Sequence, residues 1–490
     1  MALSIYSTLS RTQAPFAPIE PNHVRMYVCG VTVYDYCHIG HGRTFVAFDV
    51  VRRWLEASGM KVTFVRNITD VDDKIIRRAA ERGITTTELT EEFGRAMQED
   101  MLALGCLAPT HEPRATDYIP EMLGLIEKLE QKGYAYQGSD GDVDFAVRKF
   151  ENYGRLSGKS IDDLQSGARV DVAAGKRDPL DFALWKAAKP GEPSWKSPWG
   201  EGRPGWHTEC AAMVHRYLGV PIDIHGGGSD LAFPHHENEC AQATCAWHQG
   251  FSNTWMHTGM LLVNGEKMSK SLGNFFTLEE VLEKHSAAAL RLLMLQTHYR
   301  SPLDFSFERL EGAESSLVRI AGTAQNLRWA AAHATGEPDA ALAQKLADAV
   351  AAADAEFKAC MNDDFNTAGA LGAFFGFITE ANSYLDAADG AVNAEVVVAA
   401  AEFIERSMDV LGIELPEQEA ELPVEIIALA AERAGYAGDD TAEAAEALIA
   451  ARAEARAAKD WAVADAIRDA LGELGLVVED TAAGARVKAK

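Results

Sequence analysis

Residues 24–65 carry the pattern that most restricts how this chain can fold. Val24–Cys29 is a short apolar run, and a stretch with apolar residues at helical spacing follows from about residue 38 to 55. Lys61–Val65 is the next strand-like run. A strand, a helix and a second strand in this order predict a right-handed βαβ unit and therefore a parallel sheet.

The turn between the first strand and its helix is suited to binding an anion. A helix N-terminus presents free N–H groups and positive dipole charge, and His38 and His41 add hydrogen-bond donors there. Cys29, at the end of the strand, adds a thiol that can bind a metal. Because ligands of parallel sheets bind beyond the carboxyl ends of the strands, we expect phosphate and thiol chemistry to meet in this turn.

Length, charge and cysteine content narrow the class of protein. A chain of 490 residues is too long for one hydrophobic core, so roughly two to four domains are expected. It has no run of about 20 apolar residues, no signal-peptide pattern, and seven cysteines without the spacing of a disulfide framework. We therefore expect a cytoplasmic protein without membrane contact and, lacking an evident hydrophobic interface stripe, a monomer. The net charge of −27 disfavours indiscriminate nucleic-acid binding but permits a specific nucleic-acid partner.

The rest of the chain divides into regions of distinct character. Tyr134–Phe145 predicts a β-hairpin, and the Trp-, Pro- and Gly-rich residues after it predict an insertion in the sheet domain. Beyond about residue 310 the sequence is alanine-rich with acidic faces, which predicts a helical bundle with helices at 309–333, 338–359, 364–386 and 391–411. The expected bounds are 1–125 and 201–250 for the two halves of a Rossmann-like α/β domain, 126–200 for the insertion, 251–310 for a loop-bearing region, 311–415 for the bundle, and 424–490 for a small C-terminal domain.

A metal site is indicated by histidine, cysteine and glutamate residues in two parts of the chain. His235 and Glu239 are four residues apart on an expected helix and so share one face. Cys210 lies in the same half of the sheet domain and Cys29 in the other half. These four residues form a plausible tetrahedral zinc set.

Spacing alone leaves other interpretations open. His236 and Cys240 form a second i,i+4 pair on the adjacent face of the same helix. No paired Cys-x-x-Cys motif is present, so separate buried cysteines and solvated charges are an alternative for each residue taken alone.

Two segments are candidates for binding a nucleotide. Lys267 and Lys270 lie in the glycine-flanked loop 264–274, which could close over a triphosphate, although a solvated turn is the alternative for this loop by itself. The glycines at 226–228, followed by Asp230, end a strand where the backbone can approach a ribose or a base. Residues 157–160 read SGKS but lack the first glycine of a phosphate-binding P-loop.

HIGH at residues 38–41, followed by KMSKS at 267–271, resembles the signature of class I aminoacyl-tRNA synthetases. Longer stretches are similar to cysteinyl-tRNA synthetases, and the resemblance runs from about residue 20 to 485. They are CGVTVYDYCHIGHGRT, NITDVDDKI, GWHTECAAM, IHGGGSDLAFPHHENE, MNDDFNT at 361–367, and KDWAVADAIRDAL in the tail.

The resemblance implies that ATP, with Mg²⁺, activates L-cysteine, that the cysteinyl group is transferred to the 3′-terminal adenosine of tRNA(Cys), and that one Zn²⁺ selects the thiolate. It assigns the zinc ligands to Cys29, Cys210, His235 and Glu239, a choice that spacing leaves open. It implies catalytic roles for His38, His41, Lys267 and Lys270; ATP contacts from His38, His41, Gly226, Gly227, Asp230 and Lys270; contacts to the substrate cysteine from Trp206, Cys29 and Thr32; and anticodon contacts from Arg456, Trp461, Asp465 and Asp480.

Two details of the tail stay open in the sequence. Trp461 could cap the core of the small domain instead of stacking on an unpaired base. Val487 stands where the family usually has a tryptophan, although Lys488 and Lys490 keep the positive charge that accompanies it.

Three other functions share parts of this pattern. A ligase that joins cysteine to an amino-sugar inositol would use zinc and an adenylate but would not need residues beyond 310. A non-catalytic RNA-binding relative would not need HIGH and KMSKS together. A structural zinc protein would close its site with four strong ligands, whereas a carboxylate such as Glu239 suits a site that accepts a further ligand.

Overall fold

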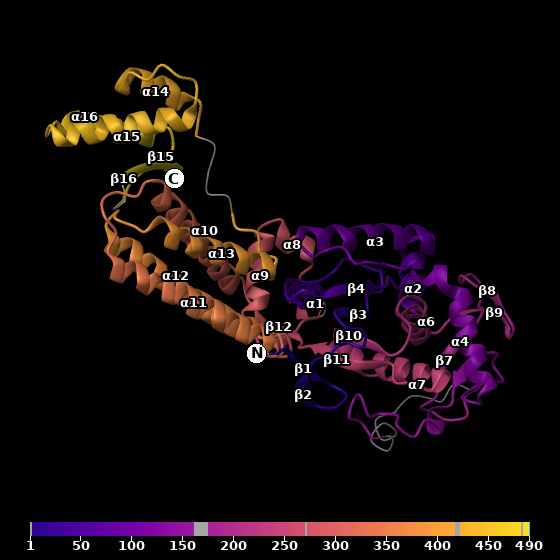
Figure 1. Ribbon diagram of the computed structural model, residues 1–490. Helices are drawn as coiled ribbons and strands as arrows, with labels where there is room; N and C mark the ends of the chain where they lie inside the picture. The colour runs from indigo at the N-terminus through magenta and orange to yellow at the C-terminus, as the bar shows by residue number, and fades with distance from the viewer. Residues whose placement is uncertain (1, 161–174, 270–271, 417–421, 482–483, 490) are drawn as a thin grey trace. The chain divides into compact units, whose positions relative to one another are not determined.

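The computed structural model describes residues 2–160, 175–269, 272–416, 422–481 and 484–489 (Figure 1). The chain forms two compact units. The first comprises residues 1–314, 358–370 and 410–413, and the second comprises residues 315–357, 371–409 and 414–490. No helix in the described part of the chain is long and apolar enough to cross a membrane.

A four-stranded parallel sheet forms the centre of the first unit, as the βαβ pattern predicts. Its strand order is β11 (Ser252–Thr258), β10 (Ile222–Gly228), β3 (His23–Val28) and β4 (Lys61–Arg66). Tyr27 and Val28 are fully buried because helices cover both faces of a parallel sheet. Since β11 begins at Ser252, the sheet continues past residue 250, where the sequence pattern predicts a new region.

Helix α1 (Ile39–Ala57) is the crossover between β3 and β4. It buries Phe45, Phe48, Val51 and Leu55 on the face that packs against the sheet, at the i, i+3, i+4 spacing expected of an amphipathic helix. The other helices that the structure describes in the sheet region are α2 (Asp73–Arg82), α3 (Thr86–Ala103), α4 (Ile119–Gln131), α6 (Trp206–Leu218) and α7 (His235–Trp247).

A five-stranded antiparallel sheet lies in the predicted insertion and extends past its expected end at residue 200. Its order is β5 (Ala135–Gln137), β6 (Val143–Phe145), β7 (Phe182–Ala187), β9 (Gly200–Pro204) and β8 (Trp195–Ser197), and β5 and β6 form the predicted hairpin. Strand β9 leads directly into α6. The insertion therefore positions the N-terminus of α6, which carries part of the site described below.

A three-stranded sheet carries the loop 264–274, called the lysine loop below because it contains Lys267 and Lys270. It consists of β13 (Glu266–Lys267), β12 (Leu261–Val263) and β14 (Leu303–Phe305), and α8 (Leu278–Leu282) and α9 (Ala287–Leu295) lie between β13 and β14 in the sequence. Near the N-terminus, β1 (Ser4–Ser7) pairs with β2 (Thr12–Pro15).

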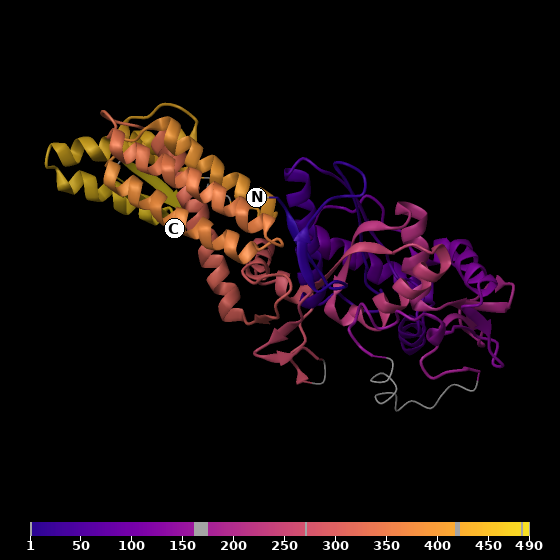
Figure 2. The ribbon, with the colours of Figure 1, turned by 60° about the horizontal axis from the view of Figure 1, so that its bottom comes forward.

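Four long helices run side by side, as the alanine-rich sequence predicts (Figures 1 and 2). They are α10 (Phe307–Ala332), α11 (Ala340–Asn362), α12 (Thr367–Ala388) and α13 (Ala394–Leu411). Phe374 and Phe377 of α12 pack against Phe403 of α13. In Figure 2 these helices are drawn in brown and orange.

The C-terminal part of the second unit is a small helical domain with a hairpin. It contains α14 (Glu425–Ala434), α15 (Thr441–Ala457), α16 (Trp461–Glu473), β15 (Leu476–Thr481) and β16 (Gly484–Ala489). Its core gathers Ile426, Leu448, Ile467 and Leu471. The sequence predicts the helices and β15, whereas β16 is evident only from its antiparallel pairing with β15.

Candidate functional site

A pocket opens at the carboxyl ends of β3, β10 and β11, where the parallel sheet predicts a ligand. Its cavity volume is about 350 Å³. It brings together side chains from the HIGH turn, the start of α2, the start of α6 and the lysine loop. The lining residues used below are Cys29, Thr32, His38, His41, Lys74, Trp206, Asp230 and Lys267.

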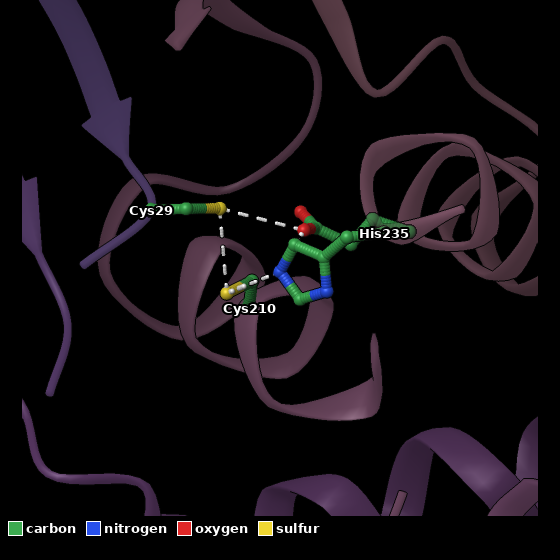
Figure 3. A group of neighbouring side chains, drawn as sticks. Cys29, Cys210 and His235 are labelled. Carbon is green, nitrogen blue, oxygen red and sulfur yellow. Dashed lines mark hydrogen bonds and ion pairs between the residues drawn. The ribbon is translucent and has the colours of Figure 1, made fainter. Parts of the chain in front are cut away.

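Four buried side chains converge at one edge of this pocket (Figure 3). Cys29 follows β3, Cys210 lies in α6, and His235 and Glu239 lie one turn apart in α7. The Sγ atoms of Cys29 and Cys210 are 3.6 Å apart, Cys210 Sγ is 3.6 Å from His235 Nε2, and Cys29 Sγ is 3.4 Å from Glu239 Oε1. The sequence-predicted set is therefore assembled in space.

The donor set fits a zinc ion. Two thiolates on one tetrahedral Zn²⁺, each at ~2.3 Å, lie about 3.8 Å apart, and the two sulfur atoms here are 3.6 Å apart. A disulfide needs a bond of about 2.05 Å, so these cysteines are not cross-linked to each other. His235 Nε2 and Glu239 Oε1 are 2.7 Å apart, at hydrogen-bond distance.

The charges of the cluster also suit a cation. Burial alone would raise the pKa of Glu239, but the charges of His235 and His225 hold it well below its usual range. Burial likewise opposes the ionisation of Cys210, yet hydrogen bonds from Cys29 and His235 lower the pKa of its thiol to about 6. Against the opposing effect of burial, the Glu239 charge and the Cys210 hydrogen bond raise the pKa of His235 to about 10. A proton on His235 thus balances the negative groups, and a divalent cation would displace it.

Neighbouring histidines hold the cluster without belonging to the predicted set. His225 Nε2 lies 2.8 Å from Glu239 Oε2, with both side chains fully buried. His236 Nδ1 lies 2.8 Å from His257 Nε2. The second i,i+4 pair is not brought together with the thiols: Cys240 is in neither group of metal-competent side chains found in the described residues, although His236 forms a smaller group with Cys29 and His225.

The HIGH turn is built differently from the open helix N-terminus that the sequence pattern suggests. His38 is the N-cap of α1, and its Nδ1 accepts from the N–H groups of Gly40 (3.1 Å) and His41 (3.3 Å). His41 Nδ1 accepts from the N–H of His38 at 3.3 Å. These N–H groups are therefore used within the turn and are not offered to an anion.

The reciprocal cap determines what the two rings can donate. A ring nitrogen that accepts carries no proton, so a neutral ring in either position carries its proton on Nε2. Burial, followed by the positive charges of His38 and Lys74, holds the pKa of His41 well below its usual range, so this ring is neutral. The two rings stack with centroids 3.7 Å apart. The turn thus presents Nε2–H donors instead of backbone N–H groups.

The lysine loop lies against the HIGH turn through backbone contacts. Ile39 N donates to Phe276 O at 3.2 Å, and Leu278 N donates to Cys37 O at 2.8 Å. Lys267, at the end of β13, lines the pocket. Lys270 lies outside the described residues.

Lys74 is a pocket cation that the sequence interpretation missed. It lies in the first turn of α2, lines the pocket, and places its Nζ 5.3 Å from the ring centroid of Tyr34. Its position after β4 is the signal that could have found it, because the turns after neighbouring parallel strands meet at one edge of the sheet.

The remaining predicted contacts divide between the pocket and its surroundings. Trp206 begins α6, lines the pocket and stacks on His235 with centroids 4.1 Å apart. Asp230 also lines the pocket. Gly226 instead packs against the ring of Phe48, and Gly227 packs beneath His236, so close packing accounts for both glycines.

The predicted anticodon residues lie in the small C-terminal domain. Arg456 and Asp465 are exposed, and Asp465 forms an ion pair with Arg468 at 2.9 Å. Trp461 is 59% exposed at the start of α16, so it does not cap the domain core. Asp480 lies in β15, but its side chain is outside the described set.

Family models match three stretches of the chain. A model described as the tRNA synthetases class I (C) catalytic domain matches residues 15–315. A DALR domain model matches residues 356–416, and a Cysteinyl-tRNA ligase anticodon binding domain model matches residues 438–487.

Similar proteins are found among curated sequences and solved structures. The chain is 52% identical to a cysteine–tRNA ligase of Delftia acidovorans, across 99% of this chain and 98% of that protein, and 51% identical to one of Laribacter hongkongensis, across 98% of each. A Mycobacterium tuberculosis methionyl-tRNA synthetase in complex with methionyl-adenylate matches with a TM-score of 0.60 at 15% identity, covering 81% of this chain and 92% of that chain. The Thermus thermophilus arginyl-tRNA synthetase matches with a TM-score of 0.55 at 16% identity, covering 84% of each chain. These structural matches confirm the predicted fold class.

Proposed function

Because the chain belongs to the class I cysteinyl-tRNA synthetase family, we propose that it activates L-cysteine with ATP and esterifies it to tRNA(Cys). The observation that supports this proposal best is the pocket, where the HIGH histidines, Lys267 and the Cys/His/Glu cluster lie together at the carboxyl ends of the parallel strands. An amino-sugar acceptor is not favoured, since it has no use for an anticodon-binding domain.

The cluster of Cys29, Cys210, His235 and Glu239 would hold one Zn²⁺. When bound, zinc favours a soft thiolate over a serine hydroxyl, because coordination lowers the pKa of a thiol and removes its proton. Trp206, which stacks on His235 and lines the pocket, would cover the side chain of the bound amino acid, and Thr32 lines the same pocket. Discrimination of this kind can exceed the ~1–3 kcal/mol available from one methylene.

Adenylation requires the cysteine carboxylate to attack the α-phosphorus of ATP while pyrophosphate leaves. The Nε2–H groups of His38 and His41 would donate to phosphate oxygens, and Lys267 and Lys74 would balance the charge that accumulates there. Lys270, on the same loop, would add a further cation. Mg²⁺ would accompany the ATP, and Asp230 would contact its ribose.

Transfer would then move the cysteinyl group from the adenylate to the 2′-hydroxyl of the 3′-terminal adenosine of the tRNA. Exposed Arg456, Trp461 and Asp465 would contact the anticodon, by stacking on unpaired bases and accepting from their amino groups. Asp480 would contribute from the hairpin. We place this reaction in the cytoplasm and assign it to a monomer.

The proposal is tested by charging total tRNA with each of the 20 amino acids in turn. Esterification of cysteine alone supports it, and charging with another amino acid would overturn it. ATP–pyrophosphate exchange separates the zinc argument from the rest: exchange with cysteine but not with serine is expected. Equal exchange with both amino acids would refute selection by zinc.

A further inference from the structure

We propose that Arg43 is a positioning residue for adenylation, which fixes the strand that carries Lys267 relative to the HIGH turn. Arg43 lies in α1, two residues after His41. The inference rests on the role proposed above for Lys267. It assigns Arg43 no contact with ATP or cysteine, since Arg43 is not among the residues that line the substrate pocket.

Arg43 is buried in a way that an ion pair does not explain. Its side chain is 2% exposed, and it has no carboxylate partner among the described residues. Its Nη2 lies over three backbone carbonyl oxygens, those of His298 (3.3 Å), Tyr299 (3.4 Å) and Ser301. Within the described part of the chain, its Nε and Nη1 have no hydrogen-bond partner. Burying a cation without a counter-ion is costly. The favourable contribution of Arg43 therefore comes from the hydrogen bonds that Nη2 donates to the 298–301 backbone.

That backbone segment supports the strands of the lysine loop. Tyr299 O, which faces Arg43, also accepts from Gly259 N at 2.7 Å. Leu303 N donates to Met260 O at 3.0 Å, and β14 then pairs in parallel with β12. Strand β12 pairs in turn with β13, whose Lys267 lies opposite Leu262. A short chain of hydrogen bonds therefore joins Arg43 to Lys267.

The backbone at Gly259 crosses the backbone at residues 300–301 in close contact, so neither segment can shift far relative to the other. A Cβ atom on Gly259 would lie 2.3 Å from Ser301 O and 2.7 Å from Arg300 O, so the two backbones touch directly. A second tie lies beside the first, where Thr44 Oγ1 and Thr258 Oγ1 are 2.9 Å apart. Arg43 and Thr44, which are consecutive in α1, thus hold the 298–301 backbone and Thr258, the last residue of β11.

One helix therefore sets the distance between two groups of phosphate donors. The N-terminus of α1 carries the HIGH histidines, and its next turn holds the base of the β12–β13 hairpin. Loosening this base would displace Lys267 from the phosphates while leaving the thiol-binding cluster untouched. A misplacement of about 1 Å in a catalytic group can cost about 100-fold in rate.

The test is a double-mutant cycle between Arg43→Lys and Lys267→Ala in the zinc-loaded full-length protein, read by ATP–pyrophosphate exchange. A lysine side chain is one bond shorter than arginine, so its ammonium nitrogen cannot reach the position that Nη2 occupies between the three carbonyl oxygens. We expect Arg43→Lys to lower the kcat of exchange about 100-fold, with full zinc content and an unchanged KM for cysteine. The double variant should be no slower than Lys267→Ala alone, because both changes remove the same contribution.

Arg291→Lys is the matched control. Arg291 is also buried against α1, at 1% exposure, but it pairs with Asp49 and donates to Leu104 O and Leu411 O, away from the loop. It should lower thermal stability and leave exchange within about twofold. If Arg43→Lys gives no folded protein, Thr258→Val removes the neighbouring tie and should show the same coupling to Lys267.

The outcomes separate this inference from the proposed function. Lys267→Ala with unchanged exchange would refute the role of Lys267. Lys267→Ala with slowed exchange, combined with multiplicative effects of the two substitutions, would overturn the positioning role of Arg43 alone. Amide hydrogen exchange gives an independent readout: residues 261–263 should exchange faster in Arg43→Lys than in Arg291→Lys.

Discussion

Replacing His225 with phenylalanine should weaken zinc binding without disturbing the packing around the cluster. His225 Nε2 lies 2.8 Å from Glu239 Oε2, and its ring stacks on Trp255 with centroids 4.4 Å apart and an interplanar angle of 14°. Phenylalanine keeps an aromatic ring against the tryptophan and removes the donor. The variant therefore isolates one hydrogen bond to a metal ligand.

The expected loss follows from the burial of this pair. Removing an outer hydrogen bond to a metal ligand costs about 10- to 100-fold in metal affinity, which is about 1.4–2.8 kcal/mol. His225 and Glu239 are both 0% exposed, so solvent does not replace the lost donor, and we expect the upper half of that range. Competition with a chelator at buffered free zinc measures the change in Kd.

His215→Phe serves as the control for this measurement. His215 also stacks on a tryptophan, Trp247, with centroids 4.2 Å apart, but it is not part of either metal-competent group in the described residues. It should bind zinc as the unmodified protein does. A Kd for His225→Phe within twofold of that value would refute the argument that this histidine orients Glu239.

Three further predictions address the pocket, the scaffold and the C-terminal domain. Lys74→Met should lower the rate of ATP–pyrophosphate exchange about 100-fold with little change in the KM for cysteine, and an unchanged rate would remove Lys74 from the phosphate site. Burial, followed by the charges of Glu279 and Glu99, raises the pKa of Asp100 from 3.8 to about 7, so the folded protein holds this proton more tightly than the unfolded chain and loses stability as pH rises from 4 toward 7. After a discount for partial solvent exposure, Asp100→Asn should add about 1–3 kcal/mol of unfolding free energy at pH 8 and almost none at pH 4, as measured by urea denaturation, and equal gains at both pH values would contradict this. Deletion of residues 424–490 should preserve cysteine-dependent exchange and sharply reduce tRNA charging, whereas full charging would show that this domain is dispensable.

Local patterns were enough to predict much of the fold. The strand, helix and strand around the HIGH turn, the β-hairpin of the insertion and the four long helices all follow from periodicity and turn residues close together in the sequence. The zinc ligands could not be chosen in this way, because spacing does not distinguish the pair His235 and Glu239 from the pair His236 and Cys240 on the same helix. Only the resemblance to a family separated Glu239 from Cys240, and the assembled cluster includes Glu239.

The features that escaped prediction depend on contacts between distant residues. Arg43 and Ser301 meet across 258 positions, and no local pattern marks either as a partner of the other. The nucleotide contact of Gly226 stays a prediction, and the sequence does not show that its lack of a side chain also makes room for Phe48. His38 caps the N-terminus of its own helix, because its ring is oriented so that Nδ1 accepts from the backbone. The sequence of the HIGH motif does not show this orientation.

The cluster at the end of β3 also has a consequence for folding. Cys29 and Cys210 are separated by 181 positions, and the inserted antiparallel sheet lies between them in the chain. An ion held by both thiols would tie together the two halves of the parallel sheet. Its binding free energy would then add to the free energy of unfolding, by an amount that grows with the concentration of free zinc. The thiolates that would hold the zinc for amino-acid selection would thus also make the stability of the domain depend on the concentration of zinc.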